Sequence, residues 1–376
     1  MVKNISILQR GAGSMKSDVS NRQIFFLLYL TLSTYTLISI PKVLAERAGT
    51  GAWVPILIMT AVFSLLVVLV VRLGNKFPGR MLFDYSQEIA GKFFGYVLSI
   101  FYALYFLLIS VYLNVQLTNV LKAEFFPKTP DWAMLVAGVA VFGCMAYKGV
   151  NSVVRFIEVI GPVYLLTAIS IHFVMLLQGD INNILPLFRP TEAMRYLAAS
   201  KDTILSFLGI EILTIVPFAK HNEKKAAVTA FFTLLFIGFI YVLAVETSFM
   251  MLGINNVQNY NYSLIEAIKV VNIPVLERVE ILYLTVGFFG LVAGVCVVYL
   301  ALVEYVARLF SKVDRKFIVL VLGVFIITLG RIGQTAKDSN KFFDSVIPII
   351  GMIAAFLIPA LLLVIARVKG LGQKTK

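Results

Sequence analysis

The sequence is poor in the residues that build soluble proteins and metal centres. Of its 376 residues only 14% are charged, two are cysteine and two are histidine. Cys144 and Cys296 lie in apolar runs, which excludes a disulfide framework and favours small buried hydrophobic side chains. His172 falls in the middle of an apolar span and His221 in a basic loop, so neither has companions at ligand spacing. We therefore expect no metal site and no cofactor.

Signatures of common enzymes are missing as well. The chain has no hydrolase triad, no Walker loop and no dinucleotide-binding fingerprint. It also has no low-complexity segment and no water-soluble domain. We predict that the protein is not an enzyme.

Long hydrophobic runs fill most of the chain. Hydrophobic residues make up 60% of it and the mean hydropathy is +0.90, values typical of a multi-pass membrane protein. We predict an all-α integral membrane protein with about ten transmembrane helices. The expected spans are residues 24–46, 53–74, 94–121, 132–148, 154–178, 196–219, 226–252, 276–308, 317–335 and 343–366.

The net charge of +13 is explained by membrane topology and not by nucleic-acid binding. With the N-terminus inside, the predicted cytoplasmic segments hold 21 of the 33 Lys and Arg residues and the outer segments hold 12. This asymmetry favours both termini in the cytoplasm, which an even number of spans allows. We expect a cytoplasmic segment at 1–22, a single transmembrane domain at 23–367 and a cytoplasmic tail at 368–376.

Two connections are long enough to carry short surface helices. Residues 77–92 are too polar to span and are predicted to form an amphipathic interfacial helix. Residues 255–272 form the longest loop on the opposite side, and its second part has helical periodicity.

Span six carries polar and helix-breaking residues in its middle. Residues 203–217 read Thr-Ile-Leu-Ser-Phe-Leu-Gly-Ile-Glu-Ile-Leu-Thr-Ile-Val-Pro, with Gly209, Glu211 and Pro217 inside an apolar run. Membrane helices tolerate such features mainly where the backbone opens onto a cavity. We predict a broken helix that faces a ligand; the alternative is a continuous helix with a packing glycine.

Span one is interrupted at the corresponding place. Ser33, Thr34 and Thr36 lie in mid-membrane and Pro41 follows. The two interrupted spans stand five apart, which predicts an inverted repeat with repeat one at about 24–178 and repeat two at about 196–366. The alternative is that these hydroxyls bond to their own helix.

A few intramembrane polar groups are candidates for function. Glu211 is the strongest, and Glu246 in span seven is a second possible proton or polar relay. Tyr105 is the tyrosine of span three nearest the middle of the membrane, which makes its hydroxyl a candidate ligand contact.

Taken together, the motifs resemble the GerAB-type endospore germination permeases. These are B subunits of spore nutrient-germinant receptors and relatives of the amino acid–polyamine–organocation transporters. The likeness covers nearly the whole chain and rests on the ordered set Ile40-Pro41, Phe77-Pro-Gly…Phe83-Asp-Tyr85…Gly91-Lys92, Ile181-Asn-Asn-Ile-Leu-Pro186 and Ser206-Phe-Leu-Gly-Ile-Glu211 with Pro217.

The resemblance implies a LeuT-like fold of five plus five spans with helices 1 and 6 broken. It also implies a location in the spore inner membrane or cell membrane, partner subunits of the A and C types, and a pocket for an amino acid or similar nutrient. By position, the span-one break falls on Ser33–Thr36. The implied ligand contacts are Ser33, Thr34, Tyr35, Thr36, Tyr105, Ile109, Phe207, Leu208, Gly209, Ile215, Gly294 and Val298.

One departure from the family pattern concerns the span-one break. Family members often have Gly-x-Gly there, whereas this chain has Thr34-Tyr35-Thr36. Bulkier residues with less backbone freedom shrink the pocket or replace backbone N–H donors with hydroxyls. Small residues at Gly294 and Val298 offset part of the lost volume.

Three hypotheses follow from the sequence. The leading one is a ligand sensor, in which a nutrient favours one conformation and so drives partner subunits. The second is a proton-coupled amino acid transporter that uses Glu211 or Glu246 as its relay. The third is a scaffold subunit whose pocket is vestigial.

Overall fold

The computed structural model describes residues 19–218, 223–272, 279–335 and 339–372. Within these ranges the chain is almost wholly helical and has no strand. Among the described residues, eight helical spans are long and apolar enough to cross a bilayer, as the hydropathy predicts. They are α4 (Trp53–Asn75), α6 (Lys92–Glu124), α7 (Asp131–Lys148), α8 (Val150–Gln178), α11 (Glu223–Leu252), α14 (Val279–Leu309), α15 (Arg315–Thr335), and a composite of α16 (Ser339–Met352), the π-helical segment η6 (Ile353–Leu357) and α17 (Ile358–Val368).

The other two predicted spans are the interrupted ones. Span one consists of α2 (Asn21–Thr36) and α3 (Ile40–Ala48), which together with the following turn are bent by 62° at the break between them. Span six is divided further, into α9 (Ala193–Ala199), η4 (Ser200–Thr203), α10 (Ile204–Phe207) and η5 (Ile210–Ile215). The expected pair of broken helices is therefore present.

Short helices occupy the connections. The predicted interfacial helix is α5 (Leu82–Ala90), and the long loop carries α12 (Ile254–Val257) and α13 (Ser263–Lys269). Residues 276–278 of the predicted eighth span lie outside the described residues. The remaining short elements are η1 (Gly49–Gly51), η2 (Ile181–Ile184) and η3 (Pro190–Glu192).

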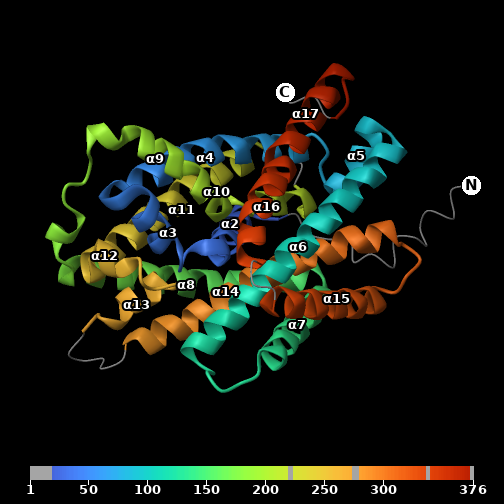
Figure 1. Ribbon diagram of the computed structural model, residues 1–376. Coiled ribbons are helices and arrows are strands. Elements are labelled where there is room, and N and C mark those ends of the chain that lie inside the picture. Colours follow the sequence, from blue (N-terminus) through green and yellow to red (C-terminus); the bar gives the residue numbers. More distant parts are fainter. Residues whose placement is uncertain (1–18, 219–222, 273–278, 336–338, 373–376) are drawn as a thin grey trace, which may run out of the picture.

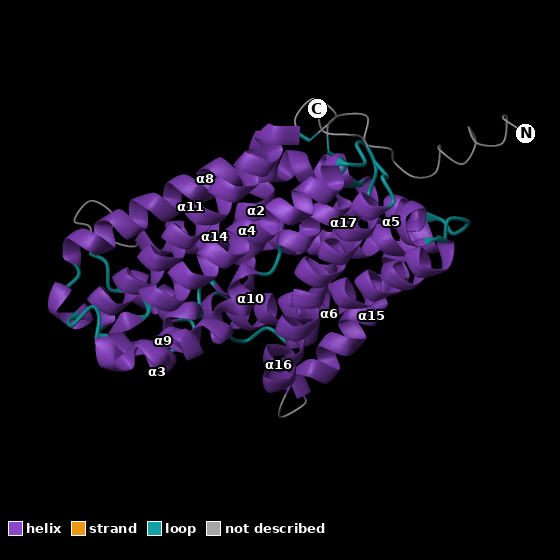
Figure 2. Ribbon diagram, turned by 90° about the horizontal axis from the view of Figure 1, so that it is seen from above, coloured by secondary structure: helices purple, strands orange, loops and turns teal. Residues whose placement is uncertain are grey.

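The helices run between two distinct ends of the molecule. In Figures 1 and 2, α3 and α9 lie at one end and α5 lies at the other, and Figure 1 places α12 and α13 with α3. We call these the α3 end and the α5 end. The distribution of Lys and Arg predicts that the α3 end faces outward.

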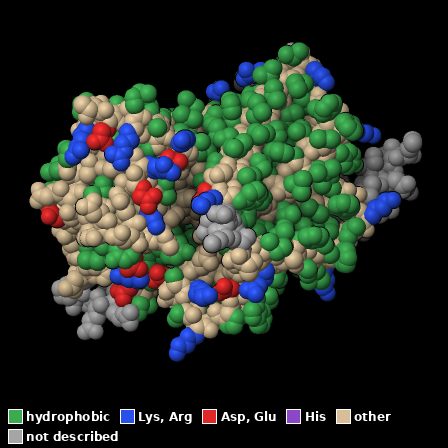
Figure 3. All heavy atoms as spheres, in the orientation of Figure 1, with side chains coloured by type: hydrophobic (Ala, Val, Ile, Leu, Met, Phe, Trp, Pro, Cys, Tyr) green, Lys and Arg blue, Asp and Glu red, His purple; other side chains and the backbone are tan. Residues whose placement is uncertain are grey.

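Helix α14 is the central element of the bundle. In its apolar stretch 72% of the residues are buried, the largest share among the eight spans, and it packs on α2, α6, α7 and α8. The outer helices instead present apolar side chains to their surroundings, among them Leu65, Leu166 and Val324. Figure 3 shows hydrophobic side chains over much of one face, with charged side chains gathered toward the α3 end. Such a surface suits lipid.

The break in span one falls later than the sequence indicates. Ser33–Thr36 remain helical, and the turn lies at residues 37–39. The Thr34 hydroxyl donates to the Leu30 carbonyl at 2.7 Å, so this side chain bonds within its own helix, as the alternative reading of the hydroxyls allows. Pro41 suits the first turn of the next helix, where its missing N–H costs nothing, and the chain resumes there as α3.

The break in span six is centred on Gly209, as expected. Its φ of +117° is a conformation that residues with a Cβ rarely adopt. Leu208 before it is extended and ends α10, while η5 begins directly after it. A Cβ at Gly209 would lie 3.0 Å from Leu32 Cδ1 and 3.2 Å from Thr31 Cγ2. The broken segment of span six therefore lies against α2, just before the break of span one.

Candidate functional site

A cavity of about 950 Å³ lies at the α3 end, between the two broken spans. Its walls come from α2, α3, α6, η4, α10, α14, α16 and the loop before α13. The volume is in the range of small-molecule sites. Its uncharged polar lining includes Thr34, Tyr35, Thr36, Tyr112, Gln116 and Ser206, and its charged lining consists of Lys42, Glu46, Arg47, Lys122, Lys201, Asp202 and Asp344.

We call the lining residues of α2 and α10 the floor of the cavity, and there the two breaks are in direct contact. The Thr36 hydroxyl, at the end of α2, donates to Ser206 Oγ of α10 at 2.5 Å. The Ser206 carbonyl in turn accepts a hydrogen bond of 2.8 Å from the Tyr241 hydroxyl of α11. A molecule at this floor touches both broken helices at once.

Beneath the floor lies a fully buried carboxyl group. Glu211 has no exposed surface, and its oxygens accept the Gly209 N–H at 2.9 and 3.0 Å. Oε1 also accepts the Tyr105 hydroxyl of α6 at 2.6 Å. These bonds offset much of the cost of burying a polar group. They bring together three of the residues singled out from the sequence.

Tyr35 separates this group from the cavity. Its side chain lines the cavity but is only 3% exposed. Its hydroxyl lies near Glu211 and Tyr105, yet it is in hydrogen-bond geometry with neither. The Tyr35 ring thus forms part of the floor, with its polar end turned inward.

Three of the twelve expected ligand contacts, Thr34, Tyr35 and Thr36, line the cavity. The others are packed more deeply. The Phe207 ring, for example, lies 5.5 Å from that of Phe63 and 5.3 Å from that of Tyr241. Expected contacts that do not line the cavity are Ser33, Tyr105, Ile109, Phe207, Leu208, Gly209, Ile215, Gly294 and Val298.

The cavity lies about one helical turn nearer the α3 end than the expected contacts. On α14 it is lined by Leu291 and Val295, where the sequence indicated Gly294 and Val298. On α6 it is lined by Tyr112 and Gln116, beyond Ile109 toward the α3 end. Residues three or four positions apart share a helix face, so the sequence indicates which residues on each helix are alternatives. Which of them line the cavity depends on how the helices pack in the assembled bundle.

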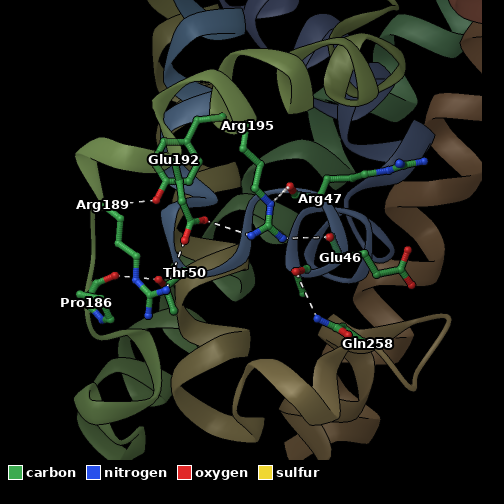
Figure 4. Close-up of polar contacts among 10 residues, drawn as sticks. Glu46, Arg47, Thr50, Pro186, Arg189, Glu192, Arg195 and Gln258 are labelled. Atoms are coloured by element: carbon green, nitrogen blue, oxygen red, sulfur yellow. Dashed lines mark hydrogen bonds and ion pairs between the residues drawn. The ribbon is translucent and has the colours of Figure 1, made fainter.

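The mouth of the cavity is braced by a polar network (Figure 4). Arg195 of α9 donates to the carbonyls of Arg47 at 2.8 Å and Glu46 at 3.3 Å, near the C-terminal end of α3. It also pairs with Glu192 at 3.0 Å, which in turn pairs with Arg189 at 3.2 Å. A cation suits the C-terminus of a helix. The network ties α3 to α9, the first helix of span six.

Two groups near the mouth, outside the spans, have shifted pKa values. Burial and the nearby Glu124 carboxylate raise the pKa of Tyr262, a lining residue, to about 12. Burial lowers the pKa of Lys269, but its bonds to Glu266 at 2.8 Å and Glu124 at 3.0 Å outweigh this and raise it overall. Tyr262 is therefore an uncharged part of the wall at neutral pH.

Stacked aromatic rings pack between α6 and α14. Tyr102 and Tyr305 lie 5.2 Å apart with their planes nearly parallel. The Tyr102 hydroxyl donates to the Ala354 carbonyl in η6 at 2.6 Å, and the Tyr305 hydroxyl donates to Thr214 Oγ1 at 2.9 Å. Neither ring lines the cavity.

Glu246, the second expected relay, lies away from the cavity. Its carboxyl group faces the first turn of α4 at Trp53, with neither oxygen in hydrogen-bond geometry. Within the described ranges, no three His, Cys, Asp or Glu side chains gather as a metal site would require.

Comparison with known proteins places the chain in a family. Residues 18–338 match the family model described as "Spore germination protein". The chain belongs to this family. Spore germination protein YndE of Bacillus subtilis (strain 168) is 23% identical over 375 residues, which is 96% of this chain and 99% of that protein. Spore germination protein GerQB of Bacillus cereus is 22% identical over 281 residues, 74% of this chain and 76% of that protein.

Solved structures of transporters share the architecture of this spore germination protein. MhsT, in complex with L-phenylalanine, has a TM-score of 0.66 at 15% identity and covers 92% of this chain and 98% of its own. Mhp1, a nucleobase–cation symporter, has a TM-score of 0.60 at 12% identity and covers 95% of each chain. These likenesses confirm the expected LeuT-like fold.

Proposed function

We propose that this chain is the membrane subunit of a spore germinant receptor and that it binds a small nutrient, an amino acid or similar molecule, in the cavity between its broken spans. One observation carries the proposal: in a chain of the spore germination family, the cavity floor is the contact between Thr36 and Ser206, where the two helix breaks meet.

The mechanism follows from the contacts that join the cavity to the two broken spans. The cavity lies at the α3 end, and its floor is shared by α2 and α10. A nutrient that contacts both breaks, and contacts them better in one arrangement, shifts the population toward that arrangement. The network of Arg195 connects α3 to α9, the first helix of span six, so those parts are expected to move together.

We further propose the membrane, the partner subunits and the orientation in which the chain works. The relatives' names support work in spore germination, and the sequence resemblance supports A-type and C-type partner subunits in the spore inner membrane. The charge asymmetry supports cytoplasmic termini, with the α3 end outward. The domain division at 22/23 and 367/368, with two repeats, is part of the same proposal. Proton-coupled amino acid transport is no better supported, and a flux assay in proteoliposomes separates the two.

A pair of identical substitutions tests the proposal in spores. Val43 of α3 lines the cavity, whereas Val62 of α4 is 40% exposed on the outer surface. Val43→Trp should fill part of the cavity and abolish the nutrient response. Val62→Trp should leave that response intact at the same protein level.

Germination is followed by the fall in optical density after each nutrient is added. If Val43→Trp spores respond to nutrient like Val62→Trp spores, the cavity does not sense it. If spores lacking the chain respond like wild type, the receptor role itself is excluded.

A further inference from the structure

The connection between α14 and α15 is a tight hairpin at the α5 end of the molecule (Figure 1). Residues 310–314 join the two helices. The Val313 N–H donates to the Phe310 carbonyl at 3.0 Å, which closes a turn. The Asp314 carboxylate accepts the Lys316 N–H at 2.9 Å and so caps the start of α15. The backbone of the hairpin is therefore held by its own hydrogen bonds.

The hairpin exposes apolar side chains. Phe310 is 59% exposed and Phe317 is 61% exposed, and Val313 between them is exposed as well. Phe317 also begins the outward apolar face of α15, which continues at Leu320 and Val324. Such a face suits the hydrocarbon of a bilayer, and aromatic side chains favour its boundary with water. The hairpin thus lies where the lipid-facing surface begins.

Three lysines surround these apolar side chains. Lys312 and Lys316 are exposed on the hairpin, and Lys148 is exposed at the end of α7. Arg315 donates to the Ala146 carbonyl at 2.8 and 3.0 Å, which brings the end of α7 against the start of α15. Within the part of the chain that the structure describes, none of the three lysines pairs with an acidic side chain.

Three other basic residues at this end are engaged inside the protein. Arg308 donates to both oxygens of Asp84 in α5, at 2.6 and 2.8 Å. Arg315 pairs with the buried Glu304 at 2.7 Å, and Lys369 donates to a backbone carbonyl of α5 at 2.8 Å. The three lysines around the hairpin differ from these, because their charges remain available to an external anion.

We propose that the hairpin is a docking surface for the anionic phospholipids of the bilayer. Its apolar side chains enter the boundary between headgroups and acyl chains, and the three lysines bind the lipid phosphates beside them. Basic residues next to a membrane are attracted to anionic lipid, and exposed apolar side chains add to the binding. Asp314 is the acidic residue of the hairpin, and it leaves the surface with a net positive charge. The inference does not depend on the proposed receptor role.

Quenching of tryptophan fluorescence by brominated lipids tests the inference. The chain has two tryptophans, Trp53 and Trp132. Replacing both by Phe and introducing Phe317→Trp places a single reporter on the hairpin. The Trp53→Phe variant keeps Trp132, which lies at the opposite end of α7 from Lys148 and is the matched reporter.

Each protein is reconstituted into phosphatidylcholine vesicles that contain a small fraction of phosphatidylglycerol. One of the two lipids carries bromine near its headgroup, and the two preparations are compared. Both leaflets have the same composition, so the orientation of the protein in the vesicle does not affect the result. On the hairpin, brominated phosphatidylglycerol should quench more strongly than its share of the lipid predicts. At Trp132 it should not.

Removing the charges should remove the preference. Lys312→Gln together with Lys316→Gln should lower the preference for phosphatidylglycerol by about fivefold for each lysine. Raising the salt concentration should lower it without any substitution, because salt screens exposed charges. Lys128→Gln together with Arg331→Gln removes two exposed cations from the other ends of α7 and α15, and should leave the preference unchanged.

Three outcomes would overturn the inference. Equal quenching by the two lipids on the hairpin excludes lipid selectivity and leaves an acidic protein segment as the occupant that its charge would fit. The same preference at Trp132 shows that phosphatidylglycerol follows the charge of the whole protein. A preference that persists without both lysines and at high salt shows that charge does not create it. Nutrient binding is untouched by any of these results, so the proposed function stands or falls separately.

Discussion

Gly294 is predicted to set the distance between α2 and α14. A Cβ at this position would lie 1.8 Å from Thr34 Oγ1, 2.7 Å from Thr34 Cβ and 2.8 Å from the Leu30 carbonyl oxygen. These distances are too short for real contacts, and two of the three atoms are held in the α2 hydrogen bond from Thr34 to Leu30. Gly294→Ala must therefore move α2 or break that bond.

The expected loss of stability in Gly294→Ala combines two effects. Overpacking a buried contact by one methyl group typically destabilises by about 1–3 kcal/mol. Losing the bond from Thr34 to Leu30 adds about 1 kcal/mol. We expect Gly294→Ala to lower the free energy of unfolding by about 2–4 kcal/mol.

The same helix supplies the control. At Gly287 the nearest atom to an added Cβ is Tyr283 Cε1 at 4.0 Å, an ordinary contact. Gly287→Ala should be neutral or stabilising by up to about 1 kcal/mol, since alanine favours helix. Unfolding in mixed detergent micelles measures both variants, and thermal midpoints provide a second readout.

A double substitution identifies the clashing partner. Thr34→Ala removes the hydroxyl that an added Cβ would meet first, so it should recover part of the loss in Gly294→Ala, and the two changes should not be additive. Equal stability of the Gly294→Ala and Gly287→Ala variants would refute the close approach of α2 to α14, and with it the packing that positions the break of span one.

The remaining predictions concern the buried carboxyl group and the mouth of the cavity. Tyr105→Phe removes one of the hydrogen bonds that the buried Glu211 carboxyl accepts and should lower the free energy of unfolding by about 1–3 kcal/mol; an unchanged free energy of unfolding would contradict this pairing. Arg195→Ala should speed hydrogen exchange of the α3 amides and cost at most about 1 kcal/mol, because its side chain is 48% exposed; unchanged exchange there would show that Arg195 does not brace α3.

The architecture was accessible from the sequence because membrane crossing leaves a long and simple signal. Runs of apolar residues gave the spans, and the paired interruptions near Ser33 and Gly209 gave the two broken helices. Gly209 located its break because only glycine readily adopts the φ that the chain requires there. The connections α5 and α13 followed from their polarity and helical periodicity.

The position of the site along the helices could not be predicted from the sequence. Whether Gly294 or Val295 faces the cavity depends on how α14 packs on α2, a contact between residues far apart in the chain. The break of span one was placed too early because the hydroxyl of Thr34 bonds within its helix. The partners of Glu211 include Tyr105 from another span, and no local pattern records that pairing.

The central claim is that the cavity between the broken spans binds the nutrient. Isothermal titration of the purified protein with a nutrient that triggers the spores tests it most directly, with Val43→Trp and Val62→Trp side by side. Binding of one molecule per chain in wild type and Val62→Trp, lost in Val43→Trp, is the predicted result. Equal affinity in all three proteins would contradict it.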